Sequence, residues 1–182
     1  MLSKEIKNYI NTNRRDFTNQ PFSEEMALDN PIKQYEKWFD EALKSNILDP
    51  YAACLSTVDN LGRPSSRILY IRDISPKGFV FYTNYNSSKG SDLKLNKYAS
   101  LNVFWGELER QIRIQGIISK VDDSESDKYF NSRPRASQIG AWASNQSQKI
   151  KDRSELESKI KFYEQQFENK NVSRPPHWGG YC

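Results

Sequence analysis

The chain has 182 residues, with 27 basic and 23 acidic side chains and a formal net charge of +4. No apolar run approaches the roughly 18 residues that a membrane span needs, and we expect no signal peptide at the N-terminus. One histidine, His177, and two cysteines, Cys54 and Cys182, exclude a Cys/His zinc site and a disulfide framework within one chain. Two unpaired thiols favour a cytoplasmic location, and a bound cofactor would have to supply any chemistry.

The first predicted element is a helix that begins at Asn30-Pro31, a capping residue followed by proline at the first helical position. The apolar residues after it recur at helical spacing, and Asp49-Pro50 predicts that the helix ends near Asn46. Strands are predicted next, over residues 52–58, 65–71, 79–83, 99–105 and 111–121, with a hairpin turn at residues 59–62 and a short helix around 91–95. Short strands joined by tight turns predict an antiparallel barrel.

The remainder of the chain is predicted to be helical. One helical segment covers residues 125–132, and Pro134 must end or kink it. A longer helix begins at Asp152, with Glu155 as its capping-box partner, and Leu156, Ile160, Tyr163 and Phe167 form its apolar face. No repeat or linker separates these parts, so we predict one α+β domain over residues 1–182, with residues 1–30 as an N-terminal arm or helix.

Basic residues are concentrated in the middle of the chain. Residues 67–97 hold six basic and two acidic side chains, a local excess of +4, which favours an anion, a phosphate or nucleic acid as ligand. Arg67 and Arg72 flank a predicted strand there. Their odd spacing places them on opposite faces, so they share a ligand only if the strand bends or ends between them. The alternative is solvated charge on a half-exposed strand.

Three further clusters could bind a ligand. Tyr82 and Thr83 end a predicted strand, and the polar loop after them holds Ser88 and Lys89, which suits a phosphate cradle or an ordinary helix cap. Gln111 can donate and accept hydrogen bonds, as the edge of a ring with both N and C=O groups requires.

The last cluster is Tyr129, Arg133 and Ser137, followed by Gln146-Ser147. The first three residues are spaced as on one helical face, but Pro134 forbids a continuous helix, so they converge only where one helix ends and the next begins. Hydroxyl, guanidinium and hydroxyl groups together would suit a phosphate monoester.

Several segments, in order along the chain, resemble the pyridoxine/pyridoxamine 5′-phosphate oxidase family. They are residues 14–17, 67–69, 78–84, 108–111, 129–135, 137–142, 146–147, 156–159 and 178–181. Long matches in a fixed order are more specific than a single motif, and they cover essentially the whole chain. The resemblance implies an antiparallel split β-barrel that binds FMN at the interface of a homodimer.

The resemblance also implies roles for particular residues. The expected FMN contacts are Arg67, Ile68, Leu69, Arg72, Tyr82, Thr83, Ser88, Lys89, Gln111, Gln146 and Ser147. The expected substrate contacts are Arg14, Arg15, Asp16, Phe17, Arg72, Tyr129, Arg133 and Ser137. The implied reaction passes a hydride from C4′ of pyridoxine or pyridoxamine 5′-phosphate to FMN, and dioxygen then reoxidises the flavin, which yields pyridoxal 5′-phosphate and hydrogen peroxide.

Three features depart from the family pattern. Arg72 stands where lysine is usual, and a planar guanidinium is not interchangeable with an ammonium. Ser88 stands where an arginine usually precedes Lys89, so one charge-assisted contact of about 1.5–3 kcal/mol to the flavin phosphate is expected to be missing. The chain ends at Cys182, before the family's Arg-Leu-His-Asp-Arg motif, and His177 is not the histidine of that motif because it precedes Trp178-Gly-Gly.

Three hypotheses follow. The first is an FMN-dependent oxidase that makes pyridoxal 5′-phosphate, and the second is a binding protein that keeps the fold and an FMN or B6-phosphate ligand without oxidase activity. The third, nucleic-acid binding, depends only on the charge of residues 67–97. We expect the oxidase, with a small-molecule B6 phosphate as substrate and with no metal, nucleic-acid or membrane partner.

Overall fold

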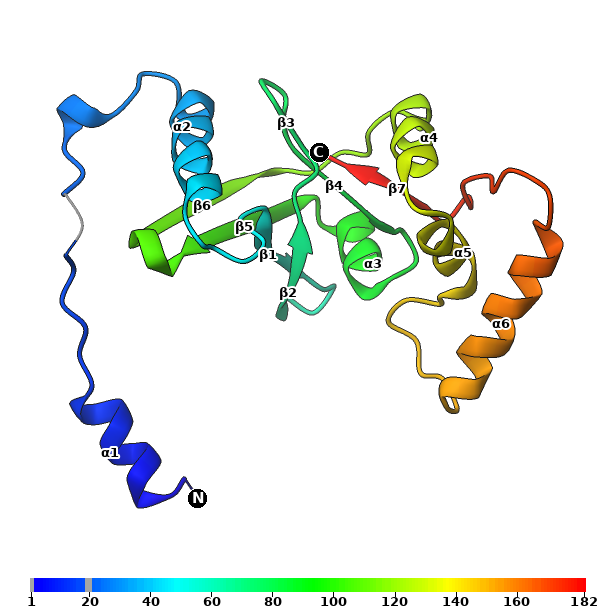
Figure 1. The fold of residues 1–182 in the computed structure, drawn as a ribbon, viewed down its shortest axis with the longest axis horizontal. Coiled ribbons are helices and arrows are strands. Elements are labelled where there is room, and N and C mark those ends of the chain that lie inside the picture. The colour runs from blue at the N-terminus through cyan, green and yellow to red at the C-terminus, as the bar shows by residue number, and fades with distance from the viewer. Residues whose placement is uncertain (1, 19–20) are drawn as a thin grey trace.

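The computed structural model describes residues 2–18 and 21–182. It is an α+β fold in which two antiparallel sheets form the centre and helices lie at both ends (Figure 1). Within the described residues, no helix combines the length and apolarity that crossing a membrane requires. In chain order the elements are α1 (Lys4–Thr12), η1 (Glu24–Met26), α2 (Pro31–Lys44), β1 (Ala52–Val58), β2 (Pro64–Tyr70), β3 (Asp73–Ser75), β4 (Gly78–Asn84), α3 (Ser88–Leu95), β5 (Tyr98–Trp105), η2 (Gly106–Leu108), β6 (Arg110–Ile117), α4 (Asp123–Ser132), α5 (Arg135–Ala143), α6 (Arg153–Gln166) and β7 (Trp178–Tyr181).

The two sheets are the halves of a split barrel. One sheet has the strand order β2-β1-β5-β6, and the other has the order β3-β4-β7. The turn between β1 and β2 is the predicted hairpin, in which Asp59 Oδ1 accepts hydrogen bonds from the backbone N–H groups of Leu61 (2.8 Å) and Arg63 (2.9 Å). Gly62 lies there at φ +77°, a conformation that glycine adopts without strain.

The first core cluster lies between the sheets and α2. Leu55, Phe81, Val103 and Trp105 come from three strands, β1, β4 and β5, and are buried. Helix α2 covers them with Tyr35, which is 3% exposed. The helix begins where its cap predicts, because the Asn30 side chain accepts hydrogen bonds from the N–H groups at residues 32 and 33.

The second core cluster joins α4, α5, α6 and β7. Phe130, Ile139 and Trp178 are its buried members, and the apolar face of α6 packs against them through residues 160, 163 and 167. Pro134 separates α4 from α5, as the sequence predicts, so the backbone turns between two short helices.

Several elements differ from the sequence prediction. Strand β6 ends at Ile117 rather than at residue 121, and α3 begins three residues earlier than expected. Strands β3 and β7 were not among the predicted elements, whereas helix α1 lies within residues 1–30, where an N-terminal arm or helix was expected. Strand β7 is short and contains Gly179 and Gly180. A Cβ at Gly179 would lie 2.2 Å from the Tyr85 hydroxyl, so the backbone fits only without a side chain.

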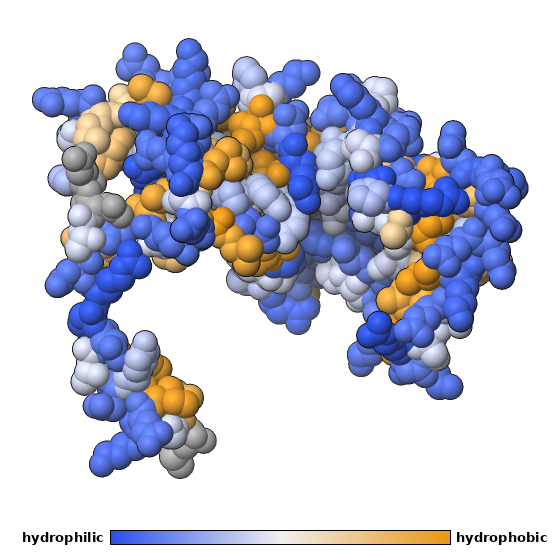
Figure 2. Space-filling model, viewed as in Figure 1, coloured by the Kyte–Doolittle hydropathy of each residue, from blue (hydrophilic) through white to orange (hydrophobic). Residues whose placement is uncertain are grey.

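Helix α1 stands apart from the rest of the fold (Figure 1) and has no buried residue. Its apolar side chains, such as Ile6 and Ile10, are exposed, and Figure 2 shows hydrophobic atoms on the surface of this helix. The expected N-terminal arm over residues 1–30 therefore contains a helix that the described core does not cover. Residues 1, 19 and 20 of that arm lie outside the described residues.

Candidate functional site

An open cavity of about 1150 Å³ lies beside β2, between the end of β4 and the junction of α4 with α5. Four basic side chains line it, Arg67, Arg72, Lys89 and Arg133, and its lining contains neither aspartate nor glutamate. We call it the cationic cavity. Its other lining residues are Ser65, Ile68, Leu69, Tyr70, Tyr82, Thr83, Ser88, Tyr129, Ser132, Pro134, Ser137, Gln146, Ser147 and Trp178. Positive charge without lining carboxylates favours an anionic ligand.

Lys89 lies on the first turn of α3, whose N-cap is Ser87. Its side chain is buried, and Nζ donates to Thr83 Oγ1 (3.2 Å), Ser87 Oγ (3.1 Å) and Gln146 Oε1 (2.8 Å). Burial, and then the nearby charge of Arg67, lowers the pKa of Lys89 to about 8. A buried ammonium held only by neutral oxygens is well suited to a phosphate group.

Arg67 is fixed beside Lys89 by a hydrogen-bond network. Its Nη1 donates to Thr57 Oγ1 (2.7 Å) and to the Leu55 carbonyl (3.2 Å), and Nη2 donates to Ser65 Oγ (2.6 Å). Thr57 Oγ1 in turn donates to the buried carboxylate of Asp92 at 2.6 Å. Burial lowers the pKa of Arg67, whereas Asp92 opposes that shift. The network holds the guanidinium of Arg67 at the same end of the cavity as Lys89.

Arg133 caps the C-terminus of α4, and its guanidinium lies 4.6 Å from the ring centroid of Trp178. Its Nη1 is buried and has no hydrogen-bond partner among the described residues. Burial lowers the pKa of this group. Because a buried donor without a partner costs free energy, the site is incomplete until an acceptor such as a phosphate oxygen occupies it.

Trp178, the ring that lies against Arg133, belongs to a wall of three aromatic rings. Tyr82 stacks on Tyr129 with ring centroids 3.8 Å apart and an interplanar angle of 9°, and Trp178 continues the stack at 5.6 Å from Tyr82. The rings come from β4, α4 and β7, so three separate elements form this wall of the cavity. The sequence analysis did not assign a role to Trp178; its only signal was its place in the Trp-Gly-Gly-Tyr segment.

The structure brings most of the predicted site residues together. Strand β2 ends at Tyr70 before β3 begins at Asp73, so the condition under which Arg67 and Arg72 share a ligand is met. The other predicted residues that line the cavity are Ile68, Leu69, Tyr82, Thr83, Ser88, Lys89, Tyr129, Arg133, Ser137, Gln146 and Ser147. Tyr70 and Ser65 also line it, and the sequence analysis missed both because they lie within a strand with no polar motif.

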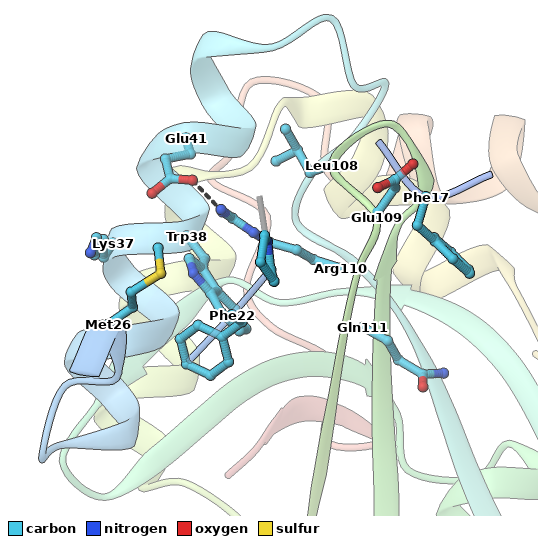
Figure 3. Close-up of a pocket in the computed structure, with 11 residues that line it drawn as sticks. Phe17, Phe22, Met26, Lys37, Trp38, Glu41, Leu108, Glu109, Arg110 and Gln111 are labelled. Carbon is cyan, nitrogen blue, oxygen red and sulfur yellow. Dashed lines mark hydrogen bonds and ion pairs between the residues drawn. The ribbon is translucent and has the colours of Figure 1, made fainter. Parts of the chain in front are cut away.

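Five predicted residues do not line the cationic cavity. They are Gln111 and the N-terminal residues Arg14, Arg15, Asp16 and Phe17. Gln111 and Phe17 line a second hollow of about 600 Å³, formed by α2, η2, the start of β6 and the N-terminal segment (Figure 3). We call this hollow the α2 pocket.

Most charges of the α2 pocket are paired within the protein, whereas Lys37 is exposed and has no ion pair among the described residues. Arg110 forms an ion pair with Glu41 (Figure 3), and its guanidinium lies 4.9 Å from the ring centroid of Trp38. Glu109 pairs with Arg15 at 3.0 Å and accepts hydrogen bonds from the backbone N–H of Thr18. The N-terminal segment is thus attached to the tip of the β5–β6 hairpin rather than to the cationic cavity.

The fold and the cationic cavity define a split-barrel protein built to bind anionic ligands. Residues 39–167 match the family described as "Pyridoxamine 5'-phosphate oxidase". A pyridoxine/pyridoxamine 5'-phosphate oxidase of Acaryochloris marina is 47% identical over 168 residues, which cover 92% of this chain and 77% of that protein. Another from Cytophaga hutchinsonii is also 47% identical, over 169 residues that cover 92% of this chain and 79% of that protein. The chain belongs to the pyridoxamine 5′-phosphate oxidase family.

Solved structures agree with the fold. PhzG from Burkholderia lata, solved in complex with tetrahydrophenazine-1-carboxylic acid, matches with a TM-score of 0.79 and 30% identity over 85% of this chain and 75% of that chain. A pyridoxamine 5'-phosphate oxidase-related, FMN binding protein from Nostoc punctiforme matches with a TM-score of 0.62 over 86% of this chain and 81% of that chain. Its 18% identity supports the fold alone.

Proposed function

We propose that the protein is an FMN-dependent oxidase that converts pyridoxine 5′-phosphate or pyridoxamine 5′-phosphate to pyridoxal 5′-phosphate, with dioxygen as electron acceptor and hydrogen peroxide as second product. With pyridoxamine 5′-phosphate the reaction also consumes water and releases the amino group as ammonia. The family membership supports the reaction. The observation that carries the proposal is the cationic cavity, which has basic groups at two places, Arg67 with Lys89 and Arg72 with Arg133, and no lining carboxylate. Two such places suit two phosphate monoesters, one of the flavin and one of the substrate.

The residues of the cavity fit FMN. Lys89 offers a buried ammonium without a lining carboxylate, and Ser88 at the α3 N-terminus lines the cavity and adds hydroxyl and N–H groups for a phosphate. We assign FMN contacts to Arg67, Ile68, Leu69, Arg72, Tyr82, Thr83, Ser88, Lys89, Gln146 and Ser147 of one copy of the chain, and to Gln111 of a second copy. When bound, the flavin ring supplies the hydride-accepting and dioxygen-reducing chemistry that the side chains of this protein lack.

The substrate phosphate is assigned to the other end of the cavity. Arg133 offers the unpartnered Nη1, and Tyr129 and Ser137 line the cavity from α4 and α5. A guanidinium and two hydroxyl groups can hold the phosphate in one orientation, which directs C4′ of the substrate toward the flavin. The aromatic wall of Tyr82, Tyr129 and Trp178 limits the access of water on that side.

We further propose that the active form is a homodimer with FMN at the interface. Gln111 and residues 14–17, which the family resemblance assigns to the same site, lie outside the cationic cavity of their own chain, so a second copy would supply them. The outer sheet face also exposes apolar side chains suited to burial between copies, such as Ile68 (67% exposed) and Phe104 (68% exposed).

Complementation would test this arrangement. Homodimers of Arg67→Ala and homodimers of Gln111→Ala are both expected to be inactive. In a mixed dimer, one of the two active sites combines wild-type Arg67 from one copy with wild-type Gln111 from the other, so up to one site in two should be active. A monomer in analytical ultracentrifugation with added FMN, or mixtures that never regain activity despite subunit exchange, would contradict it.

The oxidase proposal is tested by turnover. Protein reconstituted with saturating FMN and given pyridoxamine 5′-phosphate should form pyridoxal 5′-phosphate and hydrogen peroxide in equal amounts. A flavin absorption spectrum of the purified protein, measured first, tests cofactor binding separately. Bound flavin without turnover would instead favour a non-catalytic binding protein, the alternative that Ser88 supports, because a hydroxyl stands where the family pattern has a cation beside Lys89.

Two further assignments concern the cellular compartment and the domain organisation. We place the protein in the cytoplasm because Cys54 and Cys182 are both free thiols, as a reducing compartment favours. We also treat residues 1–182 as one domain, since both core clusters share strands of the same split barrel.

A further inference from the structure

Arg72 lies at the cavity wall on the short link between β2 and β3. Its backbone N–H donates to the Val80 carbonyl at 2.7 Å, so the main chain there is fixed. Within residues 2–18 and 21–182, its side chain makes no hydrogen bond or ion pair, and the residue is exposed. A long, exposed side chain of this kind loses rotamer entropy when it binds a ligand, unless something else already holds it.

Two tyrosine rings hold this guanidinium. Cζ of Arg72 lies 4.9 Å from the ring centroid of Tyr70 and 5.2 Å from that of Tyr51. The two rings meet edge to face, with centroids 4.9 Å apart and an interplanar angle of 76°. Both distances are within the range in which a cation is attracted to an aromatic face. The rings therefore restrict Arg72 by contact rather than by hydrogen bonds.

Asp49 fixes both rings. Its Oδ1 accepts a hydrogen bond from the Tyr51 hydroxyl at 2.7 Å, and its Oδ2 accepts one from the Tyr70 hydroxyl at 3.0 Å. The hydrogen bonds to Asp49 raise the pKa of both tyrosines, so both hydroxyls stay protonated and donate. The backbone of Asp49 has φ +51°, in the left-handed region that aspartate tolerates better than most residues.

The backbone also brings the two rings together. The N–H of Ile71 donates to the Tyr51 carbonyl at 2.9 Å, and Ala52 pairs with Tyr70 across β1 and β2. Tyr70 lines the cavity, whereas Tyr51 and Asp49 lie behind its wall. The arrangement is thus a support built outside the ligand space, with only Tyr70 and Arg72 facing it.

The support matters because Arg72 acts on Arg133. The positive charge of Arg72 lowers the pKa of Arg133 further, after the larger effect of burial. Two guanidinium groups that repel each other stay close in a cavity without carboxylates only if each is held in place. Trp178 lies against Arg133, and the two tyrosines lie against Arg72.

We propose that Asp49, Tyr51 and Tyr70 are positioning residues that hold Arg72 opposite Arg133, so that the two guanidiniums grip one dianionic phosphate ester. This inference rests on the proposed function for the identity of that ester, the B6-phosphate substrate. It adds a specificity element: a guanidinium held by cation–π contacts with two rings cannot be replaced by lysine without loss, because an ammonium is a compact point charge with no planar fork to offer to a phosphate.

Equilibrium binding of pyridoxal 5′-phosphate to the FMN-loaded protein tests the proposal without requiring turnover. Tyr51→Leu, which leaves the cavity lining unchanged, is expected to weaken binding about fivefold to tenfold, and Tyr51→Phe about twofold, since the ring remains and only its anchor is lost. Tyr98→Leu is the matched control, because Tyr98 is 67% exposed on β5 and lies outside the cavity lining. It should bind like the wild type, and all four proteins are compared at saturating FMN.

A double-mutant cycle measures the coupling between Tyr51 and Arg72 in ligand binding. A residue that only stabilised the fold would show no such coupling. Arg72→Lys is expected to weaken binding about tenfold in the wild type but only about threefold in Tyr51→Leu, because part of the ring contact that positions the guanidinium is already lost there. Where turnover is measurable, the same variants should raise KM for pyridoxamine 5′-phosphate and leave kcat unchanged.

Independent effects of Tyr51→Leu and Arg72→Lys would overturn the proposal, as would wild-type binding by Tyr51→Leu or by Arg72→Ala. Binding that follows the predicted cycle in a protein without turnover would support the positioning residues while refuting the oxidase function. A wild type that binds no pyridoxal 5′-phosphate would refute both.

Discussion

The cationic cavity and the α2 pocket are both hollows lined by basic and aromatic residues, but their charges are balanced differently. In the α2 pocket, Arg110 pairs with Glu41, and Glu109 pairs with Arg15. In the cationic cavity, the lining contains no carboxylate, and Lys89 is bonded only to neutral oxygens. Charge balance, rather than volume or aromatic content, therefore distinguishes the roles of the two hollows. The cationic cavity is suited to bind an anion, whereas the ion pairs of the α2 pocket join parts of the chain.

The difference has an energetic meaning. Burying a cation without an opposite charge costs free energy, and the lowered pKa values of Lys89 and Arg133 reflect that cost. An anionic ligand recovers it on binding, because the desolvation of the cations has already occurred during folding. The α2 pocket lacks such a reserve, since Glu41, Glu109 and Arg110 are paired within the protein and Lys37 is exposed to solvent.

The largest effect is expected from removing a cation of the cavity. Lys89→Ala should weaken FMN binding about tenfold to a hundredfold, because a charge-assisted contact with the phosphate is lost. Titration of flavin fluorescence measures this affinity. Lys94→Ala is the matched control, since Lys94 is exposed on the same helix and does not line the cavity. Equal affinities in the two variants would remove the distinction between the cavity and an ordinary charged surface.

A smaller effect is expected from pH. Lys89, with a pKa of about 8 in the ligand-free protein, is charged at pH 7 and largely neutral at pH 9. FMN affinity should therefore fall about fivefold to tenfold as the pH rises from 7 to 9.

Lys89→Arg is the control for this pH dependence, because a guanidinium stays charged throughout that range. Its affinity should be nearly independent of pH. A decline of the same size in the variant would mean that another group titrates.

The sequence predicted the cavity better than the α2 pocket, for physical reasons. Lys89 and Arg133 lie at helix ends, where caps and breakers such as Pro134 can be identified, and Arg67 lies within the regular strand β2. These ends meet at one place in a small antiparallel fold. Strand β1 was predicted with its observed bounds, Ala52–Val58, because its alternation is regular and the turn after it is strongly marked.

The features that the sequence did not predict depend on contacts between segments that are distant along the chain. Strand β7 contains two glycines, although local propensity disfavours glycine in a strand. They are needed because the backbone there passes close to Tyr85 and Tyr82, and no local pattern reveals that approach. The pairing of Arg15 with Glu109 joins residues 94 positions apart. The scaffold of Arg72 likewise needs Asp49 and Tyr70, which no local pattern connects.

Detaching the N-terminal segment tests the role of the α2 pocket as an internal joint. Glu109→Gln should make cleavage by trypsin after Arg14 and Arg15 severalfold faster, because the charge that holds Arg15 and part of the anchor of Thr18 are lost. FMN affinity should change by less than about twofold, since neither Arg15 nor Glu109 lines the cationic cavity. Glu107→Gln, an exposed neighbour on η2, should leave the cleavage rate unchanged. A loss of FMN affinity as large as that of Lys89→Ala would show that the two hollows act as one site within a chain.

The smallest effect is expected for Arg110→Ala. The ion pair with Glu41 is partly exposed, and the contact with Trp38 adds a modest attraction, so the free energy of unfolding should fall by about 0.5–1.5 kcal/mol. Arg113→Ala, an exposed position on the same strand, should change it by less than about 0.5 kcal/mol. Denaturant unfolding of the flavin-free proteins measures both values. The charge of Arg110 is balanced by Glu41. Its removal should therefore lower the free energy of unfolding and leave FMN affinity unchanged. Lys89→Ala should instead weaken FMN binding without lowering the free energy of unfolding.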